Sequence, residues 1–293
     1  MPPQNKLVLA IVLLVVGNFV AAFSDAAIKV LDADVPAFQF MLLRQVIGVL
    51  LLLPLMLVLT PSHRCTLAMP LHFWRGLSMA LGGGCMVYAL VNLPLATAAS
   101  LFYTAPLMVL PLAAIWLGER LTGLRVGAAL LGIVGVLVLL RPTQINWAAL
   151  AGLGCALSIA FGLVTLKRLP AQETVVTALF WTTVWSIVPL LLLASLEWQP
   201  VSLQLLWVAL LSNLLIMAYN GLALLAFRLA DASAISPVEY SGLLFAALIG
   251  VLGFGEVPDL YSLLGMLIIM APLWLLGLDG KRARRLALSQ ESA

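Results

Sequence analysis

Ten stretches of about 20 mostly apolar residues follow one another along this chain, separated by short segments rich in turn-forming and charged residues. A helix of that length and composition crosses the hydrocarbon core of a bilayer, which is roughly 30 Å thick. Within lipid only helices and closed barrels satisfy their backbone hydrogen bonds, and barrel strands alternate apolar with polar positions. Because these runs are continuously apolar, the sequence predicts an all-α integral membrane protein.

The composition excludes the other broad classes. Of the 293 residues, 63% are hydrophobic and 9% are charged, whereas a soluble domain is about half apolar and roughly a quarter charged. Three cysteines exclude a disulfide scaffold, and a formal net charge of +3 is too small to predict a nucleic-acid partner. We therefore expect the partners to be the lipid bilayer and a small molecule, the chain acting as a monomer or homodimer.

The predicted architecture is ten transmembrane helices arranged as two inverted five-helix repeats. The predicted spans are 7–31, 36–59, 71–92, 95–117, 122–140, 147–167, 174–195, 202–227, 232–254 and 259–278. The first repeat would occupy residues 1–141 and the second residues 142–280, and residues 281–293 would form a basic cytoplasmic tail.

The distribution of lysine and arginine predicts the orientation. The N-terminus and the segments after even-numbered spans carry twelve of the 15 basic residues; Lys29 and Arg141 lie on the opposite side, and Arg44 lies within a span. Cytoplasmic loops hold the excess of basic residues in membrane proteins. Both termini are therefore expected to be cytoplasmic, with the chain crossing the cell (inner) membrane.

Pairs of identical residues recur 137 positions apart. Gly118 and Glu119 end the fourth span, Gly255 and Glu256 end the ninth, and Tyr103 matches Tyr240 at the same offset. Five spans per repeat is an odd number, so the two repeats would insert with opposite orientations. Such inverted repeats are typical of secondary transporters, in which two equivalent halves exchange inward- and outward-open forms.

A set of short motifs occurs in the first half of the chain, and a weaker second copy occurs in the second half. The first set is LPLATAA at 93–99, YTAP at 103–106, LGER at 117–120, GIVGV at 132–136 and RP at 141–142, and the second is ASAISP at 232–237, Gly255-Glu256 and Gly265. These motifs resemble the EamA family of the drug/metabolite transporter superfamily. The resemblance implies ten helices, transport of a small metabolite, and a central cavity walled mainly by the first, third, fourth, sixth, eighth and ninth helices.

Three charged side chains lie toward one end of the first two spans. Asp25 and Lys29 are four residues apart and share a helix face, and Arg44 lies at a similar depth on the second span. Ionisable groups within a membrane are costly and are usually functional. We expect Asp25 to pair with Arg44 or Lys29, either as a structural pair or as a substrate contact, with Asp25 for an ammonium and Arg44 for a carboxylate. Lys29 could instead extend to the interface.

Glu239 has no partner nearby in the sequence and lies just after Pro237 in the ninth span. A proline bends a helix and leaves a backbone carbonyl unpaired. This carboxyl is the predicted proton-coupling group and a predicted contact for a cationic substrate; a purely structural carboxyl is the alternative. The remaining candidates line a cavity or serve helix packing: Asn18, Tyr88, Tyr103, Asn220 and Tyr240.

These features favour a secondary active transporter of a small metabolite, an amino acid or related zwitterion, driven by a proton gradient or by exchange. An organic-cation carrier is the alternative, with aromatic rings around Glu239 or Asp25. An integral-membrane enzyme is a distant alternative, because His63 and His72 share one hydrophilic loop without a matching set of carboxylates. No residue spacing predicts a metal site or a cofactor, and no catalytic residue is predicted.

Overall fold

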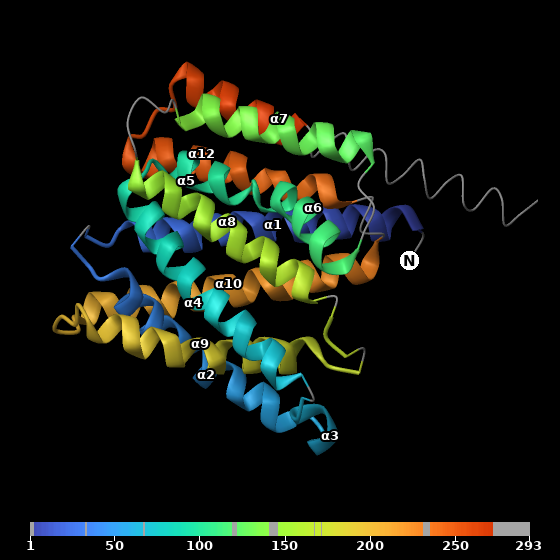
Figure 1. Cartoon of the computed structure of the whole chain (residues 1–293), viewed down its shortest axis with the longest axis vertical. Helices are drawn as coiled ribbons and strands as arrows, with labels where there is room; N and C mark the ends of the chain where they lie inside the picture. The colour runs from blue at the N-terminus through green and yellow to red at the C-terminus, as the bar shows by residue number, and fades with distance from the viewer. Residues whose placement is uncertain are drawn as a thin grey trace, which may run out of the picture.

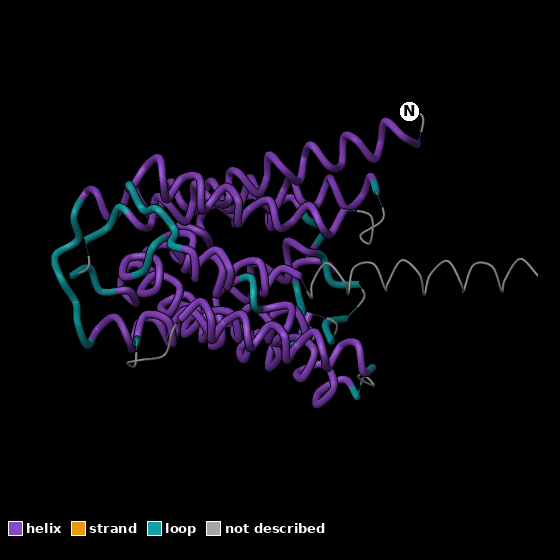
Figure 2. The backbone as a smooth tube through the Cα atoms, turned by 90° about the horizontal axis from the view of Figure 1, so that it is seen from above, coloured by secondary structure: helices purple, strands orange, loops and turns teal. Residues whose placement is uncertain are grey.

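The computed structural model describes residues 3–32, 34–66, 68–118, 122–140, 146–166, 168–170, 172–230 and 235–271. Within these residues every regular element is a helix and no strand occurs (Figure 2). The helices run roughly along one common direction and form a bundle (Figure 1). The predicted all-α class is confirmed for this part of the chain.

The helices follow the predicted spans closely. They are α1 (Pro3–Lys29), α2 (Ala37–Val58), α3 (Pro61–Arg64), α4 (Met69–Asn92), α5 (Leu95–Phe102), α6 (Ala105–Leu117), α7 (Gly123–Leu140), α8 (Trp147–Leu166), α9 (Val175–Ser195), α10 (Leu203–Leu229), η1 (Ser236–Tyr240), α12 (Ser241–Phe254) and a last helix over Leu260–Ala271. We call the end of the bundle at which α1 begins the near end, and the end at which α1 finishes the far end.

Within the described residues six helical segments are long and apolar enough to cross a membrane, and one of them, Leu95–Leu117, comprises α5 and α6 together. Three shorter apolar helices accompany them, over Val126–Leu140, Val238–Phe254 and Leu260–Ala271. The chain is therefore a multi-pass membrane protein, while the count of ten spans stays a prediction. The predicted tail at 281–293, Glu119 and Arg141 lie outside the described residues.

Local sequence signals explain where several helices begin and end. Thr174 and Ser202 cap α9 and α10, because each side-chain oxygen accepts a hydrogen bond from a backbone N–H three residues later, at 3.1 Å. Gly118 and Gly255 end α6 and α12 in the left-handed conformation, each with φ 67°. Glycine adopts this conformation without the steric cost of a Cβ atom. The two repeated glycines thus have the same structural role.

The two halves of the chain interlock rather than forming separate units. The first helix of each half packs against the third and fourth helices of the other: α1 contacts α10 and α12, and α8 contacts α4, α5 and α6. The second helices, α2 and α9, also pack together. At the fifth helices, a Cβ on Gly135 of α7 would lie 2.9 Å from the backbone nitrogen of Ile269. Every such contact joins one half to the other.

Candidate functional site

Two helices are interrupted at the same depth in the bundle, one in each half of the chain. The predicted fourth span is broken between α5 and α6 at Tyr103 and Thr104, and in the described part of the ninth span the 3₁₀ helix η1 precedes α12. Tyr103 caps the C-terminus of α5, and Tyr240 ends η1 and caps the N-terminus of α12. Their rings lie 6.1 Å apart between centroids. The repeated tyrosines therefore meet where both helices are irregular, a detail that the continuous predicted spans did not contain.

Side chains from α1 and α5 satisfy the backbone carbonyls of η1. The Asn18 amide on α1 donates to the carbonyl oxygens of Val238 at 3.0 Å and Glu239 at 3.3 Å, and to the Ser241 hydroxyl at 3.1 Å. The Tyr103 hydroxyl also donates to the Glu239 carbonyl oxygen, at 3.1 Å. Irregular backbone within a membrane is tolerated where other groups satisfy it. Asn18, which is buried, thus positions the segment that carries Glu239.

The Glu239 carboxyl lies among tyrosines. The Tyr219 hydroxyl on α10 donates to Glu239 Oε2 at 3.2 Å, and the Glu239 charge acts on Tyr103 and Tyr240 as well. We call Asn18, Tyr103, Tyr219, Glu239 and Tyr240 the Glu239 site. A carboxylate among aromatic rings is suited to an organic cation, and a carboxyl inside a membrane protein can also carry a proton. Tyr219 was missed from the sequence, although it directly precedes the predicted Asn220.

The structure does not place Asp25 at salt-bridge distance from either predicted partner. Among the described residues neither Asp25 nor Arg44 forms a salt bridge, although the Arg44 charge acts on Asp25. Lys29 pairs instead with Glu256, at 2.9 Å between Nζ and Oε1. The charge of Asp25 also acts on Tyr103 of the Glu239 site.

The Lys29–Glu256 salt bridge joins four helix ends at the far end of the bundle. Lys29 ends α1 with its side chain 8% exposed, and it also donates to the carbonyl oxygens of Leu90 at 3.3 Å and Leu93 at 2.5 Å, at the end of α4. Glu256 follows α12, and its Oε2 accepts the backbone N–H of Leu95, the first residue of α5, at 2.7 Å. Glu256 thus links the turn after α12 to the end of α1 and the start of α5.

A cavity of about 350 Å³ lies between α2, α9 and α10, with Met79 of α4 on one wall. Its lining extends from Leu55 and Val175, toward the near end, to Arg44 and Asn213 midway along the bundle. Asn220 and Arg44 are the two predicted site residues on its surface. It thus differs from the cavity that the resemblance implies, because α2 and α9, the second and seventh helices, supply much of its wall.

The predicted site residues therefore fall into separate groups. Asn18, Tyr103, Glu239 and Tyr240 come together at the Glu239 site, whereas Arg44 and Asn220 line the cavity. Tyr88 on α4 is 43% exposed and contributes only its backbone carbonyl to a hydrogen bond, with Asn92. The structure does not bring Tyr88 to either group.

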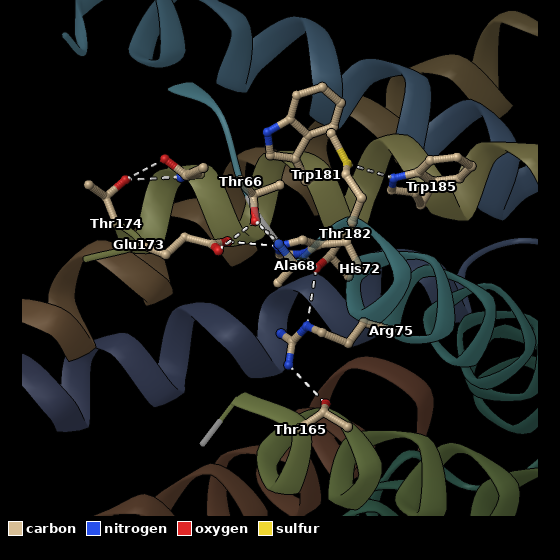
Figure 3. Close-up of polar contacts among 12 residues, drawn as sticks. Thr66, Ala68, His72, Arg75, Thr165, Glu173, Thr174, Trp181, Thr182 and Trp185 are labelled. Carbon is tan, nitrogen blue, oxygen red and sulfur yellow. Dashed lines mark hydrogen bonds and ion pairs between the residues drawn. The ribbon is translucent and has the colours of Figure 1, made fainter. Parts of the chain in front are cut away.

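A polar cluster that the sequence did not predict lies at the near end, between α4, α8 and α9 (Figure 3). His72 and Glu173 form a pair with 2.7 Å between Nε2 and Oε1, and their side chains are 0% and 3% exposed. Arg75 donates to the Gly162 carbonyl oxygen at 2.8 Å and to the Thr165 hydroxyl at 3.0 Å. His72 and Arg75 lie within α4 rather than in a loop, and they link α4 to the segments around it.

Within the described part of the chain, no group of three or more His, Cys, Asp or Glu residues could hold a metal ion. The Glu239 site and the cavity offer a carboxylate, a guanidinium, amides and phenols. Groups of these kinds can bind small molecules through hydrogen bonds and charge.

A model of the EamA-like transporter family matches residues 8–141 and again residues 146–278. The S-adenosylmethionine uptake transporter of Rickettsia felis is 29% identical over 252 residues, covering 84% of this chain and 85% of that protein. The pseudopaline exporter CntI of Pseudomonas aeruginosa is 27% identical over 270 residues, covering 89% and 93%. A riboflavin transporter of Rhizobium johnstonii is 32% identical over 229 residues, covering 74% and 75%.

One solved crystal structure matches over 96% of this chain and 99% of that chain, with a TM-score of 0.56 at 19% identity, which shows a shared fold. The family model matches the chain twice, which shows a fold of two repeats. The relatives are transporters of small molecules, so the chain is a transporter and not an enzyme. It belongs to the EamA-like transporter family.

Proposed function

We propose that this protein is a secondary active transporter that carries an amino acid or related zwitterion by alternating access. The observation that supports it most is the meeting of two broken helices, one from each repeat, at the Glu239 site. Discontinuous helices that meet near the middle of the bilayer form the substrate sites of many inverted-repeat transporters. The carboxyl of Glu239 would receive the ammonium group of the substrate, or a proton when the site is empty.

The interlocked packing supports the proposal that the repeats are inverted and that ten helices span the membrane. Each contact of α1 with the second half has a counterpart made by α8 with the first half. Such reciprocity is what a twofold axis within the membrane plane generates. In this arrangement the near end, where α1 begins, would face the cytoplasm of a cell with the protein in its inner membrane.

The proposed orientation indicates which side of the membrane is closed in this conformation. The far end would then be the outer side, where the Lys29–Glu256 salt bridge holds α1, α5 and α12 together. The cavity reaches toward the near end, past Leu55 and Val175. We infer a conformation that is closed toward the outside, and alternating access requires that this salt bridge break when the outward-open form appears.

An organic-cation carrier is the second candidate, and the three tyrosines of the Glu239 site favour it. Aromatic rings attract cations through their negative faces. S-Adenosylmethionine, the compound in the name of the Rickettsia felis relative, is both an amino acid and a sulfonium cation. It therefore belongs in any test that separates the two candidates.

Uptake into proteoliposomes tests the proposed function. The panel contains neutral and basic L-amino acids, S-adenosylmethionine, riboflavin and choline, each offered with an imposed pH gradient and, separately, with unlabelled compound inside. We expect saturable uptake of one or more amino acids or S-adenosylmethionine. Saturable uptake of choline alone would favour the organic-cation carrier. A unitary conductance, or no saturable flux of any amino acid or S-adenosylmethionine, would contradict the proposal.

A further inference from the structure

We propose that Arg44 and Gln45 form the subsite that binds the carboxylate group of the transported metabolite, in the cavity between α2, α9 and α10. This inference rests on the proposed transport function, and it adds a second site to the Glu239 site. Three observations support it. The cavity wall contains the charged Arg44, the buried amide of Gln45 has no described partner, and the neighbouring polar side chains already form hydrogen bonds.

Arg44 is the one charged residue among the described residues that line the cavity. It forms no salt bridge, since Asp25, the acidic group whose charge acts on it, lies beyond ion-pair distance. The remainder of the lining is mostly aliphatic and methionine side chains. In such surroundings a guanidinium interacts strongly with an anion, because little water screens it.

Gln45 supplies a second donor beside Arg44. Its side chain lines the same cavity and is buried, with the residue 4% exposed. Its Nε2 has no hydrogen-bond partner in the structure. Buried amide donors are nearly always paired in folded proteins, and an unpaired one calls for a partner that the chain itself does not provide. A carboxylate oxygen of a ligand is such a partner.

The other polar side chains of the wall near these two residues have partners already. The Asn213 amide donates to the Arg44 carbonyl oxygen, and the Thr183 hydroxyl donates to the Leu179 carbonyl oxygen at 2.8 Å. Asn220, the remaining polar residue of the wall, lies two turns along α10 from Asn213. At the depth of Asn213 the donors without a described partner are therefore those of Arg44 and Gln45. One guanidinium with one amide donor matches a carboxylate, whereas a phosphate would attract several cationic groups.

The two sites together explain how one zwitterion could be recognised. The charge of Asp25 acts both on Arg44 and on Tyr103 of the Glu239 site. A substrate whose carboxylate meets Arg44 and whose cationic group meets an acidic side chain would match both signs of charge. Met41, Met79 and Met217 also line the cavity and suit an apolar substrate body.

Binding of matched pairs of ligands tests this inference. Isothermal titration of the purified full chain compares L-methionine with 3-(methylthio)propylamine, and S-adenosylmethionine with its decarboxylated form. We expect the acid of at least one pair to bind about tenfold or more tightly than the amine, the magnitude of one charge-assisted hydrogen-bonded pair. Arg44→Gln should remove that advantage and leave the affinity for the amine unchanged, and Gln45→Leu should remove part of it.

Arg64→Gln is the matched control, because Arg64 lies on α3 outside the cavity and donates to the carbonyl oxygens of Leu59 and Leu57. It should leave both affinities unchanged. If Arg44→Gln does not fold, Arg44→Lys and Gln45→Leu keep the test decisive, because each should weaken the binding of the acid and leave the binding of the amine unchanged. Equal affinity for acid and amine in the native chain, equal losses for both in Arg44→Gln, or no binding of any acid would overturn the inference.

The outcome is separate from that of the transport assay. Saturable transport of the amines without preference for the acids would leave the transporter function intact and overturn the carboxylate subsite. Preferential, Arg44-dependent binding of an acid without any flux would support the subsite and contradict the proposed function.

Discussion

Replacing Glu239 by glutamine is expected to lower the rate of substrate uptake by about tenfold to a hundredfold, the loss expected for one hydrogen bond to a charged group. The variant keeps the size of the side chain and an oxygen that can accept the Tyr219 hydroxyl, now 3.2 Å from Oε2. It removes the charge that would meet a cationic group and the site that would hold a proton. Initial rates of uptake into proteoliposomes, with and without a pH gradient, measure the effect.

The control for this variant is Glu197→Gln, which removes an exposed carboxyl in the segment between α9 and α10. It should transport at the native rate. Tyr219→Phe, which removes only the hydroxyl donor to Glu239, should have an intermediate effect. A Glu239→Gln protein with the native rate and the native response to the pH gradient would remove Glu239 from the mechanism.

Breaking the salt bridge at the far end should have the largest effect on stability. Lys29→Met leaves the Glu256 carboxylate without its cation in a site where the two side chains are 8% and 23% exposed. Removing one partner of a buried pair typically costs about 3–5 kcal/mol of unfolding free energy, and partial exposure of Glu256 lowers that figure. We therefore expect a destabilisation of about 2–3 kcal/mol, measured by thermal or denaturant unfolding in detergent.

A double-mutant cycle separates the pair from its surroundings. Lys29→Met combined with Glu256→Gln removes both charges, so the double variant should be more stable than the sum of the two single losses predicts. Lys6→Met, at an exposed lysine near the start of α1, serves as the control and should have no effect. If the loss of stability in the double variant equals the sum of the two single losses, the interaction between Lys29 and Glu256 does not stabilise the protein.

The positions of the helices could be predicted from hydropathy because lipid demands long apolar helices. For example, the predicted span 36–59 extends one residue beyond α2 at each end. The predicted span 147–167 begins at the same residue as α8 and ends one residue later. The repeated Gly118 and Gly255 were also readable, since a glycine ending an apolar run often marks a left-handed cap. The breaks at Tyr103 and at η1 lie beside Pro106 and Pro237, but a proline can bend a helix without ending it, so hydropathy predicted continuous spans there.

The partners of the charged residues could not be predicted, and Lys29 shows why. Its partner Glu256 lies more than 200 residues away, and which face of α1 meets α12 depends on helix rotation. Spans that are apolar on every side contain no information on rotation, since no polar face identifies the lipid-free side. Asp25 was expected to pair with Arg44 or Lys29 because the spacing on the first span and the depth on the second were the available signals.

His72 was misplaced for a different reason. It follows several polar residues and was therefore expected in a loop, but Pro70 lies in the first turn of α4. Proline is favoured at the start of a helix, where its missing N–H costs nothing. Read in that way, Met69-Pro70 would have placed His72 and Arg75 three residues apart on one helix, facing the α8 and α9 side that holds Thr165 and Thr182.

The measurement that tests alternating access most directly is the distance between spin labels at both ends of the bundle. One pair of cysteines replaces exposed Val30 and Val257 at the far end, and another replaces exposed Val58 and Leu225 at the near end, in a variant without the three native cysteines. We predict that a transported substrate shifts the two distances in opposite senses, and that Glu256→Gln widens the far-end distance. Distances that stay fixed, or that change in the same sense at both ends while transport proceeds, would contradict alternating access around the Glu239 site.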